Sequence, residues 1–276
     1  MARANLIRIT DPHDPRVAEF RDIRERDLTG REGRFIAEGT VVLRLLAVVH
    51  GGGTGIEAEK VLLLENRLDG VRDIIDALPE SVPVMVAARP VMDAIAGFPI
   101  HRGILALGRR PAPASVEERI GSLPANALVL VASGIANHDN IGGLFRNAAA
   151  FGADTVLIDA LCCDPLYRKA IRVSVGAALK VPFAQGGDLA DILDSLGRAG
   201  FAIWGLSPSG TVPIANVPAA SRVALVVGTE GEGLPANVLS RLQTARIPQA
   251  PGFDSLNVAT AAGIALHAMA TTMGRL

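Results

Sequence analysis

Three short stretches of the sequence combine glycines with polar side chains that could bind a ligand or align a reacting group. They run over 137–152, 228–234 and 250–263. Glycine leaves room for a ligand to approach the backbone, so backbone amides and carbonyls come within reach. The polar side chains in these stretches that could contribute to chemistry are Asn140, Arg146, Glu230, Ser255 and Asn257.

The first stretch, NHDNIGGLFRNAAAFG, predicts a loop that leads into an amphipathic helix. Asparagine and aspartate at its start favour a helix N-terminus. Gly152 suits the left-handed backbone conformation with which many helices end. One helical stripe is apolar and predicts the buried face: Ile141, Leu144, Phe145, Ala148 and Ala149. Arg146 lies off that stripe, so this permanent cation has no role in the core, and it follows two glycines in the same stretch. Taken alone, it could equally be a surface arginine.

The second half of the chain predicts a parallel sheet that brings these stretches together. Short apolar runs alternate with helical patterns, and such runs suit strands that are buried on both faces. The expected strands cover 127–133, 154–160, 201–206 and 223–228, and a short strand, RIPQ, then precedes a terminal helix that Ser255 is placed to cap. Ligands bind beyond the carboxyl ends of such strands. Each glycine stretch follows an expected strand, and this joint placement favours a binding site over three unrelated tight turns.

The first half predicts a smaller α/β unit, separated from the second half by the proline-rich segment RRPAPASVEERIGSLPAN. Arginines and acids that alternate between Asp14 and Arg34 indicate a salt-bridged helix ahead of this unit. We therefore expect an N-terminal domain over 1–112 with a leading helix, a linker over 113–126 and a second domain over 127–276.

The composition indicates a folded, reduced protein. Hydrophobic residues make up 49% of the 276 residues, which excludes intrinsic disorder. The formal net charge of −1 gives no global basic signature for nucleic acid.

Cys162 and Cys163 are neighbours that cannot pair with good geometry, and the N-terminal stretch has no apolar signal core, so a cytoplasmic location is expected. The histidines show no metal-ligand spacing, and the uncharged run over 255–274 carries polar residues that favour a buried helix over a membrane span.

Four motifs in the second half resemble those of the SpoU (TrmH) branch of the SPOUT methyltransferases. The first is N-x-G-x-x-x-R, the second is a G-N-E-G-x-G-L loop with Thr229 in the asparagine position, and the third is I-P-M-x-G followed by S-L-N-V-S-x-A-A. The stretch DPLYRKAIRVSVGAALKVP is similar as well. Gln249 and Thr260 depart from the pattern. The matching positions are Asn140, Gly142 or Gly143, Arg146, Gly228 to Leu234, Ile247, Pro248, Gly252, Ser255, Leu256, Asn257, Val258, Ala261 and Ala262.

The resemblance implies S-adenosylmethionine as the cofactor and methyl transfer to a ribose 2′-hydroxyl of ribosomal or transfer RNA. It also implies a homodimer and an α/β catalytic domain whose parallel sheet carries a deep trefoil knot. The first half, with GRFIAEG and HRGILAL at its ends, resembles the small RNA-binding domains that are similar to kink-turn-binding ribosomal proteins. A catalytically inactive RNA-binding or ribosome-assembly factor of the same fold is the alternative. A nucleotide-dependent oxidoreductase is disfavoured, because no G-x-G-x-x-G follows the first strand of either half.

The resemblance also assigns roles within the site, and no metal takes part. The residues it places around the cofactor are Leu206, Gly228, Glu230, Ile247, Leu256 and Asn257. The residues it places at the reacting groups are Arg146, Asn140, Glu230, Ser255 and Asn257. Two roles for Arg146 stay open. It could act as a general base assisted by a substrate phosphate, or it could bind that phosphate and orient the hydroxyl; arginine is almost never deprotonated in proteins.

A local basic segment gives a separate indication of RNA binding. Between Pro165 and Gly187 the chain carries basic residues and no acid, which is a footprint for phosphate. A solvated helix face explains the same pattern equally well. The candidate RNA-binding residues are Arg168, Lys169 and Arg172. The target RNA and the nucleotide that is methylated stay open.

Overall fold

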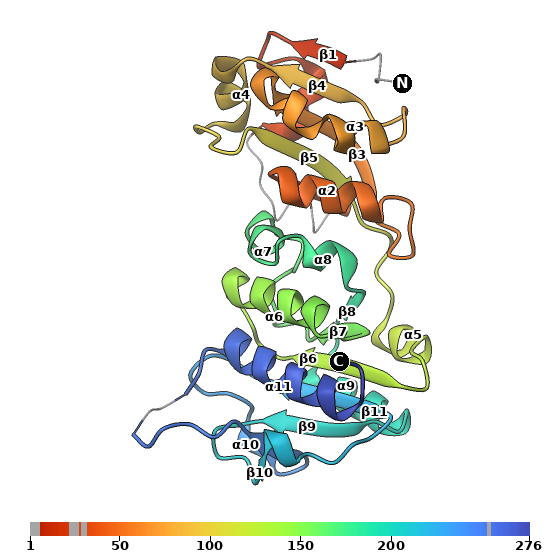
Figure 1. Ribbon diagram of the computed structural model, residues 1–276, viewed down its shortest axis with the longest axis vertical. Helices are drawn as coiled ribbons and strands as arrows, with labels where there is room; N and C mark the ends of the chain where they lie inside the picture. The colour runs from red at the N-terminus through yellow and green to blue at the C-terminus, as the bar shows by residue number, and fades with distance from the viewer. Residues whose placement is uncertain (1–5, 22–27, 29–31, 253–254) are drawn as a thin grey trace. The chain divides into compact units, whose positions relative to one another are not determined.

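The computed structural model describes residues 6–21, 28, 32–252 and 255–276, and it divides into two compact units (Figure 1). The first unit comprises Met1–Ala112 and Leu166–Lys180, and the second comprises Pro113–Pro165 and Val181–Leu276. The basic segment over 166–180 thus groups with the first unit, although it lies in the middle of the domain expected over 127–276. The leading helix expected between Asp14 and Arg34 falls partly outside the described residues, at 22–27 and 29–31, and the described part shows a 3-10 helix, η1, at Pro15–Phe20.

The first unit is built on a five-stranded mixed sheet with the order β1-β4-β3-β5-β2. β5 runs antiparallel to both β2 and β3, and the remaining pairs are parallel. The strands are β1 (Leu6–Ile9), β2 (Arg34–Glu38), β3 (Glu57–Leu64), β4 (Val84–Ala87) and β5 (Ile104–Arg109). The helices are α2 (Thr40–Val49), η3 (Glu65–Arg67), η4 (Asp69–Val71), α3 (Arg72–Ala77), α4 (Arg89–Ala96), α7 (Arg168–Val173) and α8 (Ala177–Lys180).

The second unit is built on a seven-stranded sheet with the order β10-β12-β9-β11-β6-β7-β8, in which every pair is parallel. This confirms the predicted α/β class with a parallel sheet. The strands are β6 (Ala127–Ala132), β7 (Thr155–Ile158), β8 (Phe183–Gln185), β9 (Ala202–Leu206), β10 (Val212–Pro213), β11 (Arg222–Val227) and β12 (Gln243–Arg246). The helices are α5 (Val116–Gly121), α6 (His138–Ala150), α9 (Leu189–Arg198), η5 (Ile214–Asn216), α10 (Ala236–Leu239) and α11 (Val258–Thr272).

Both faces of this sheet are buried. Val129 and Val131 of β6 pack with residues of α5 and α9, such as Ile120 and Leu196, in one core cluster. Side chains alternate between the faces of a strand, so the equally buried Leu130 points to the other face. The segment expected as a linker contains α5, which begins at a capping box formed by Ser115 and Glu118.

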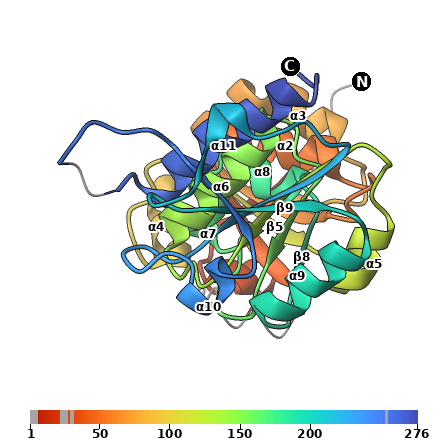
Figure 2. The same cartoon turned by 90° about the horizontal axis from the view of Figure 1, so that it is seen from below.

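Helices α6 and α11 lie side by side at very close range (Figures 1 and 2). A Cβ atom added at Gly143 would come within 2.6 Å of the Ala259 Cβ, so a larger residue there would separate the helices. Asn147 Nδ2 donates to the carbonyl of Ala259 at 2.6 Å and ties the two helices together. Among the described residues, no helix is long and apolar enough to cross a bilayer.

Candidate functional site

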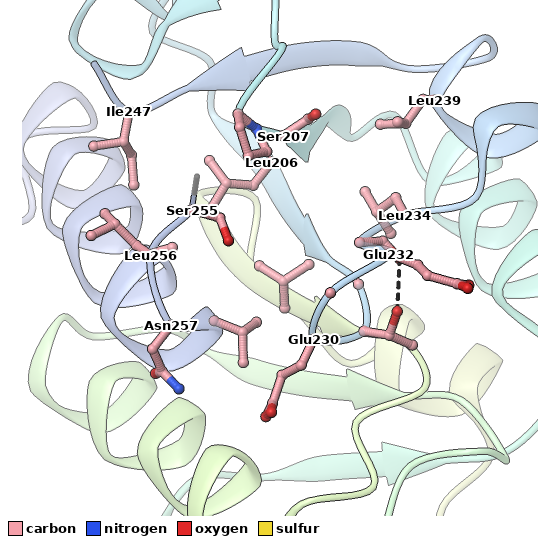
Figure 3. Close-up of a pocket in the computed structure, with 18 of the residues that line it drawn as sticks. Leu206, Ser207, Glu230, Glu232, Leu234, Leu239, Ile247, Ser255, Leu256 and Asn257 are labelled. Atoms are coloured by element: carbon pink, nitrogen blue, oxygen red, sulfur yellow. Dashed lines mark hydrogen bonds between the residues drawn. The ribbon is translucent and has the colours of Figure 1, made fainter. Parts of the chain in front are cut away.

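A cavity of about 310 Å³ lies at the carboxyl end of the parallel sheet in the second unit (Figure 3). Its walls come from the segments that follow β9, β11 and β12 and from the start of α11. Parallel strands place their carboxyl ends on one edge, which is why segments far apart in sequence meet here. The residues predicted for the site that line this cavity are Leu206, Gly228, Glu230, Ile247, Ser255, Leu256 and Asn257.

The glycine loop after β11 is a tight hairpin closed on itself. Thr229 accepts at its carbonyl from the Gly233 amide at 3.1 Å, and its hydroxyl donates to the Gly233 carbonyl at 3.2 Å. A Cβ at Gly228 would collide with the backbone of Gly233, so only glycine allows this closure. The hairpin holds the Glu230 side chain toward the end of the cavity where Asn257 lies (Figure 3).

Asn257 connects the cavity wall to a buried side chain of α6. Its Oδ1 caps α11 by accepting from the amides of Ala259 at 2.9 Å and Thr260 at 3.3 Å. Its Nδ2 donates to Oδ1 of Asn140 at 2.8 Å, and Asn140 is buried. Asn140 therefore reaches the cavity through Asn257. The prediction that Ser255 caps the last helix is wrong, because the helix begins at Val258 and Asn257 occupies the capping position.

Arg146 stands apart from the cavity wall. It is exposed on α6, and its neighbours Leu144, Phe145 and Ala148 are buried, as the apolar stripe predicts. Within the described part of the chain it makes no hydrogen bond or salt bridge. The guanidinium of Arg146 is thus open to a ligand that approaches the surface of α6 from outside.

A buried carboxylate that the sequence motifs did not single out joins two loops of the second unit. Asp159, directly after β7, accepts from the Ser133 hydroxyl at 2.6 Å and from the Gly134 amide at 3.1 Å. It also accepts from the amides of Leu161 and Cys162, both at 3.1 Å. These bonds tie the loop after β6 to the loop after β7. The available signal was an aspartate at the end of the apolar run TVLID.

The threonine of the glycine hairpin contacts a neighbouring loop. A Cβ atom at Gly134 would lie 2.5 Å from the Thr229 Cγ2 methyl group. The Thr229 side chain therefore packs against the backbone of the loop that Asp159 holds. In this way, the loop after β6 supports the hairpin that forms the cavity wall.

The two cysteines are unsuited to nucleophilic chemistry. Burial raises the pKa of the Cys162 thiol to about 12, and burial also raises the pKa of Cys163 to about 11. Cys162 Sγ accepts from the Ile135 amide and donates to the Ala132 carbonyl, each at 3.3 Å. Both thiols are therefore protonated at neutral pH and fill space. The described residues contain no group of three or more His, Cys, Asp or Glu side chains that could hold a metal ion.

The predicted RNA-binding residues lie on α7 in the first unit. Lys169 and Arg172 are exposed, and Arg168 is partly buried. Arg168 pairs with the carboxylate of Glu38 at 3.8 Å. These three cations are therefore on a different unit from the cavity.

Comparison with known proteins agrees with this architecture. A tRNA/rRNA methyltransferase of Mycobacterium bovis, described as uncharacterized, is 37% identical over 271 residues, which cover 94% of this chain and 90% of that protein. The 23S rRNA (guanosine-2′-O-)-methyltransferase RlmB of Acinetobacter baylyi is 31% identical over 225 residues, which cover 77% of this chain and 90% of that protein. The AdoMet-bound rRNA methyltransferase of Sinorhizobium meliloti has the same fold, with a TM-score of 0.78 at 20% identity, covering 96% of this chain and 97% of that one.

The motifs that suggested the resemblance lie inside the region that these comparisons define. Residues 127–267 match the profile of the SpoU rRNA Methylase family, and they include the cavity, α6 and the start of α11. Together with the similarity to the mycobacterial relative over nearly the whole chain, this match shows that the protein belongs to the SpoU rRNA methylase family.

Proposed function

We propose that this protein transfers a methyl group from S-adenosylmethionine to a ribose 2′-hydroxyl of ribosomal or transfer RNA. The observation that carries the proposal is the cavity at the carboxyl ends of β9, β11 and β12, lined by the residues that the SpoU motifs supply. RlmB of Acinetobacter baylyi, by its name a guanosine-2′-O methyltransferase of 23S rRNA, supports the reaction class. The related structure from Sinorhizobium meliloti, which is AdoMet-bound, supports the cofactor.

The cavity fits the proposed cofactor in size and chemistry. A volume of about 310 Å³ is in the range of small-molecule sites. Backbone groups at Gly228, Ile247 and Leu256 would hold the adenosine part, and Leu206 would close the apolar wall. Gln249 lines the same cavity, and its buried Oε1 has no hydrogen-bond partner among the described residues, so a polar ligand can satisfy it after the amide turns. When bound, S-adenosylmethionine supplies an electrophilic methyl group.

The polar residues around the cavity would align the ribose and manage its proton. In this proposal Arg146 binds the phosphate beside the target ribose, because a guanidinium keeps its proton and matches phosphate with a planar fork. Glu230 and Ser255 line the cavity, and in this proposal the ribose hydroxyl approaches the cofactor beside them. Asn140 acts on the site through its 2.8 Å bond to Asn257, and we class it as a positioning residue. The hydroxyl proton leaves late, to phosphate or water.

We further propose that the second unit is knotted and forms a homodimer through α6 and α11. These two helices pack against each other, and α11 carries Ile264, which is 41% exposed. A large exposed apolar side chain beside small packed residues suits an interface between copies. Replacing Ile264 by glutamate is expected to give monomers in light scattering, and an unchanged mass would reject this interface. The free adjacent cysteines suit a cytoplasmic location.

The first unit, including Arg168, Lys169 and Arg172 on α7, is proposed to hold the RNA substrate. The alternative function, an inactive RNA-binding or assembly factor, is separated from methyl transfer by one experiment. Purified protein is incubated with labelled S-adenosylmethionine and with total RNA from a strain that lacks the gene, and the 2′-O-methyl positions gained are mapped. A new 2′-O-methyl position supports the enzyme. RNA binding without transfer, together with no binding of the labelled cofactor, would favour the inactive factor.

A further inference from the structure

We propose that Phe98, on the surface of the first unit, is a stacking platform for an unpaired RNA base, flanked by arginines that bind the adjoining phosphates. The inference rests on the proposed RNA methyltransferase function and deepens it. It assigns to the first unit a preference for single-stranded over paired nucleotides. Each residue that forms this platform belongs to the first unit.

Phe98 is exposed although the loop that carries it is held firmly. Its side chain is 42% exposed, directly after Gly97 ends α4 in the left-handed conformation. Two residues later, the amide of Ile100 donates to Asp93 Oδ1 at 2.9 Å, and the carbonyl of Ile100 accepts from Arg89 Nη1 at 3.3 Å. The Ile100 side chain itself is buried. The loop therefore presents the phenyl ring on an ordered support, so stacking on it requires little further ordering.

One side of the ring is already occupied by a cation. The guanidinium carbon of Arg168 lies 5.1 Å from the centre of the Phe98 ring, within the range of a cation–π contact. The buried carboxylate of Glu38 pairs with Arg168 at 3.8 Å and fixes its direction. Aromatic rings and arginine planes are the two surfaces on which proteins stack unpaired RNA bases. Phe98 and Arg168 thus offer both kinds of surface in one place.

Further cations stand around this pair. A Cβ atom at Gly39 would come within 2.9 Å of Arg102 Cδ, so the Arg102 side chain lies across the glycine that follows Glu38. Arg172 is exposed one helical turn after Arg168 on α7. Arg168, Arg102 and Arg172, with Arg89 in the loop, thus outnumber the carboxylates of Glu38 and Asp93 in this part of the first unit. This excess of positive charge matches the phosphates of a nucleic acid.

The occupant with the best chemical match is an unpaired nucleotide. A base in a duplex has its faces covered by its neighbours, whereas a base in a loop or bulge can turn onto an aromatic ring. Stacking with arginine contacts to phosphate is also how proteins bind single strands without reading sequence. A duplex would contact the arginines but leave the ring of Phe98 unused.

The test compares two probes on the full-length protein by fluorescence anisotropy: a 12-nucleotide oligo(A) strand and the duplex that it forms with oligo(U). Phe98→Leu keeps an apolar side chain but removes the aromatic face. It is expected to weaken oligo(A) binding by about 5- to 100-fold and to change duplex binding by less than about twofold. Phe98→Tyr is expected to keep normal binding. Val48→Ala, at a position 73% exposed in the same unit, is the matched control and is expected to have no effect.

The contribution of the arginines is tested with one variant and one matched control. Arg172→Ala is expected to lower the salt dependence of binding, the slope of log K against log salt, by about one for both probes. Arg44→Ala is the control, because Arg44 already pairs with Asp73 at 2.6 Å on the exposed surface. Its removal is expected to leave the slope unchanged.

The inference is overturned if Phe98→Leu keeps its oligo(A) affinity, if it weakens both probes equally, or if the unmodified protein binds neither probe. Melting curves of each variant show whether the fold is kept, and Phe98→Tyr separates the loss of the ring from damage to the loop. Binding of labelled S-adenosylmethionine, measured on the same samples, tests the second unit independently. Normal cofactor binding and methyl transfer with unchanged Phe98→Leu affinity would reject the platform alone. An absence of both would reject the proposed function.

Discussion

Replacing Asn257 by alanine is expected to destabilise the second unit by about 2–4 kcal/mol. The Oδ1 atom caps α11 through the amides of Ala259 and Thr260, and loss of such a cap costs about 1 kcal/mol. The Nδ2 atom satisfies Oδ1 of Asn140, which is only 5% exposed. A buried acceptor left without a partner costs roughly a further 1–3 kcal/mol.

Two further variants separate these contributions. Asn257→Ser keeps a capping oxygen but is too short to reach Asn140, so it is expected to lose mainly the second contribution. A double-mutant cycle with Asn140→Ala measures the bond itself, with an expected coupling energy of about 1–2 kcal/mol.

The chain contains its own probe for this measurement. Trp204 is the single tryptophan, and it is 4% exposed on β9 of the second unit. Its fluorescence during urea unfolding therefore reports the unit that contains the site, even if the two units unfold separately. If Asn257→Ala and Asn257→Ser unfold at the same urea concentration as the original chain, or if the cycle shows no coupling, the bridge carries no energy and the reasoning fails.

Three other predictions concern the cavity and its surroundings. Arg146→Ala is expected to leave cofactor affinity and stability unchanged while turnover falls by about 100-fold or more, and Arg146→Lys is expected to restore little of that turnover. Calorimetry of cofactor binding, paired with a methyl-transfer assay, checks this, and near-normal turnover would contradict it. Gly228→Val is expected to abolish cofactor binding in calorimetry by displacing the backbone of Gly233, and retained affinity would show that the hairpin can open at low cost. For Cys162, burial raises the thiol pKa from 9.0 to about 12, so the neutral thiol persists in the folded protein well above pH 9. Alkylation in the folded protein is expected to stay slow from pH 7 to about pH 10 and to become fast in urea, and rapid labelling of the folded chain would refute the burial argument.

The placement of the cavity could be predicted from the sequence because parallel strands impose it. Apolar runs ended by glycine stretches mark the carboxyl ends of strands, and the topology brings those ends to one edge. This is why Leu206, Gly228 and Ile247, which are spread along the second half of the chain, line one cavity.

Contacts that depend on tertiary packing could not be predicted in the same way. Asn140 and Asn257 are 117 residues apart, and no local pattern says that their amides meet. Asp159 has a single sequence signal, an acid after a strand, which ordinary turns also show. The grouping of 166–180 with the first unit depends on packing between segments distant in sequence, which composition does not encode. The helix cap predicted at Ser255 is two residues too early, because Asn257 caps α11. An error of two residues in a helix boundary is therefore enough to assign the capping role to the wrong polar side chain.

Pairing of α6 with α11 makes the cavity depend on two segments that are far apart along the chain. The bonds that join the two helices connect residues 112 and 117 positions apart, and α11 is the last helix described along the chain. A growing polypeptide folds from its N-terminus, and contacts of such long range form late. A chain made only as far as β12 has its glycine hairpin but lacks the wall formed by Leu256 and Asn257. If the first unit holds RNA as proposed, chains that stop before α11 would bind the substrate without a closed cavity, and they would compete for it rather than act on it.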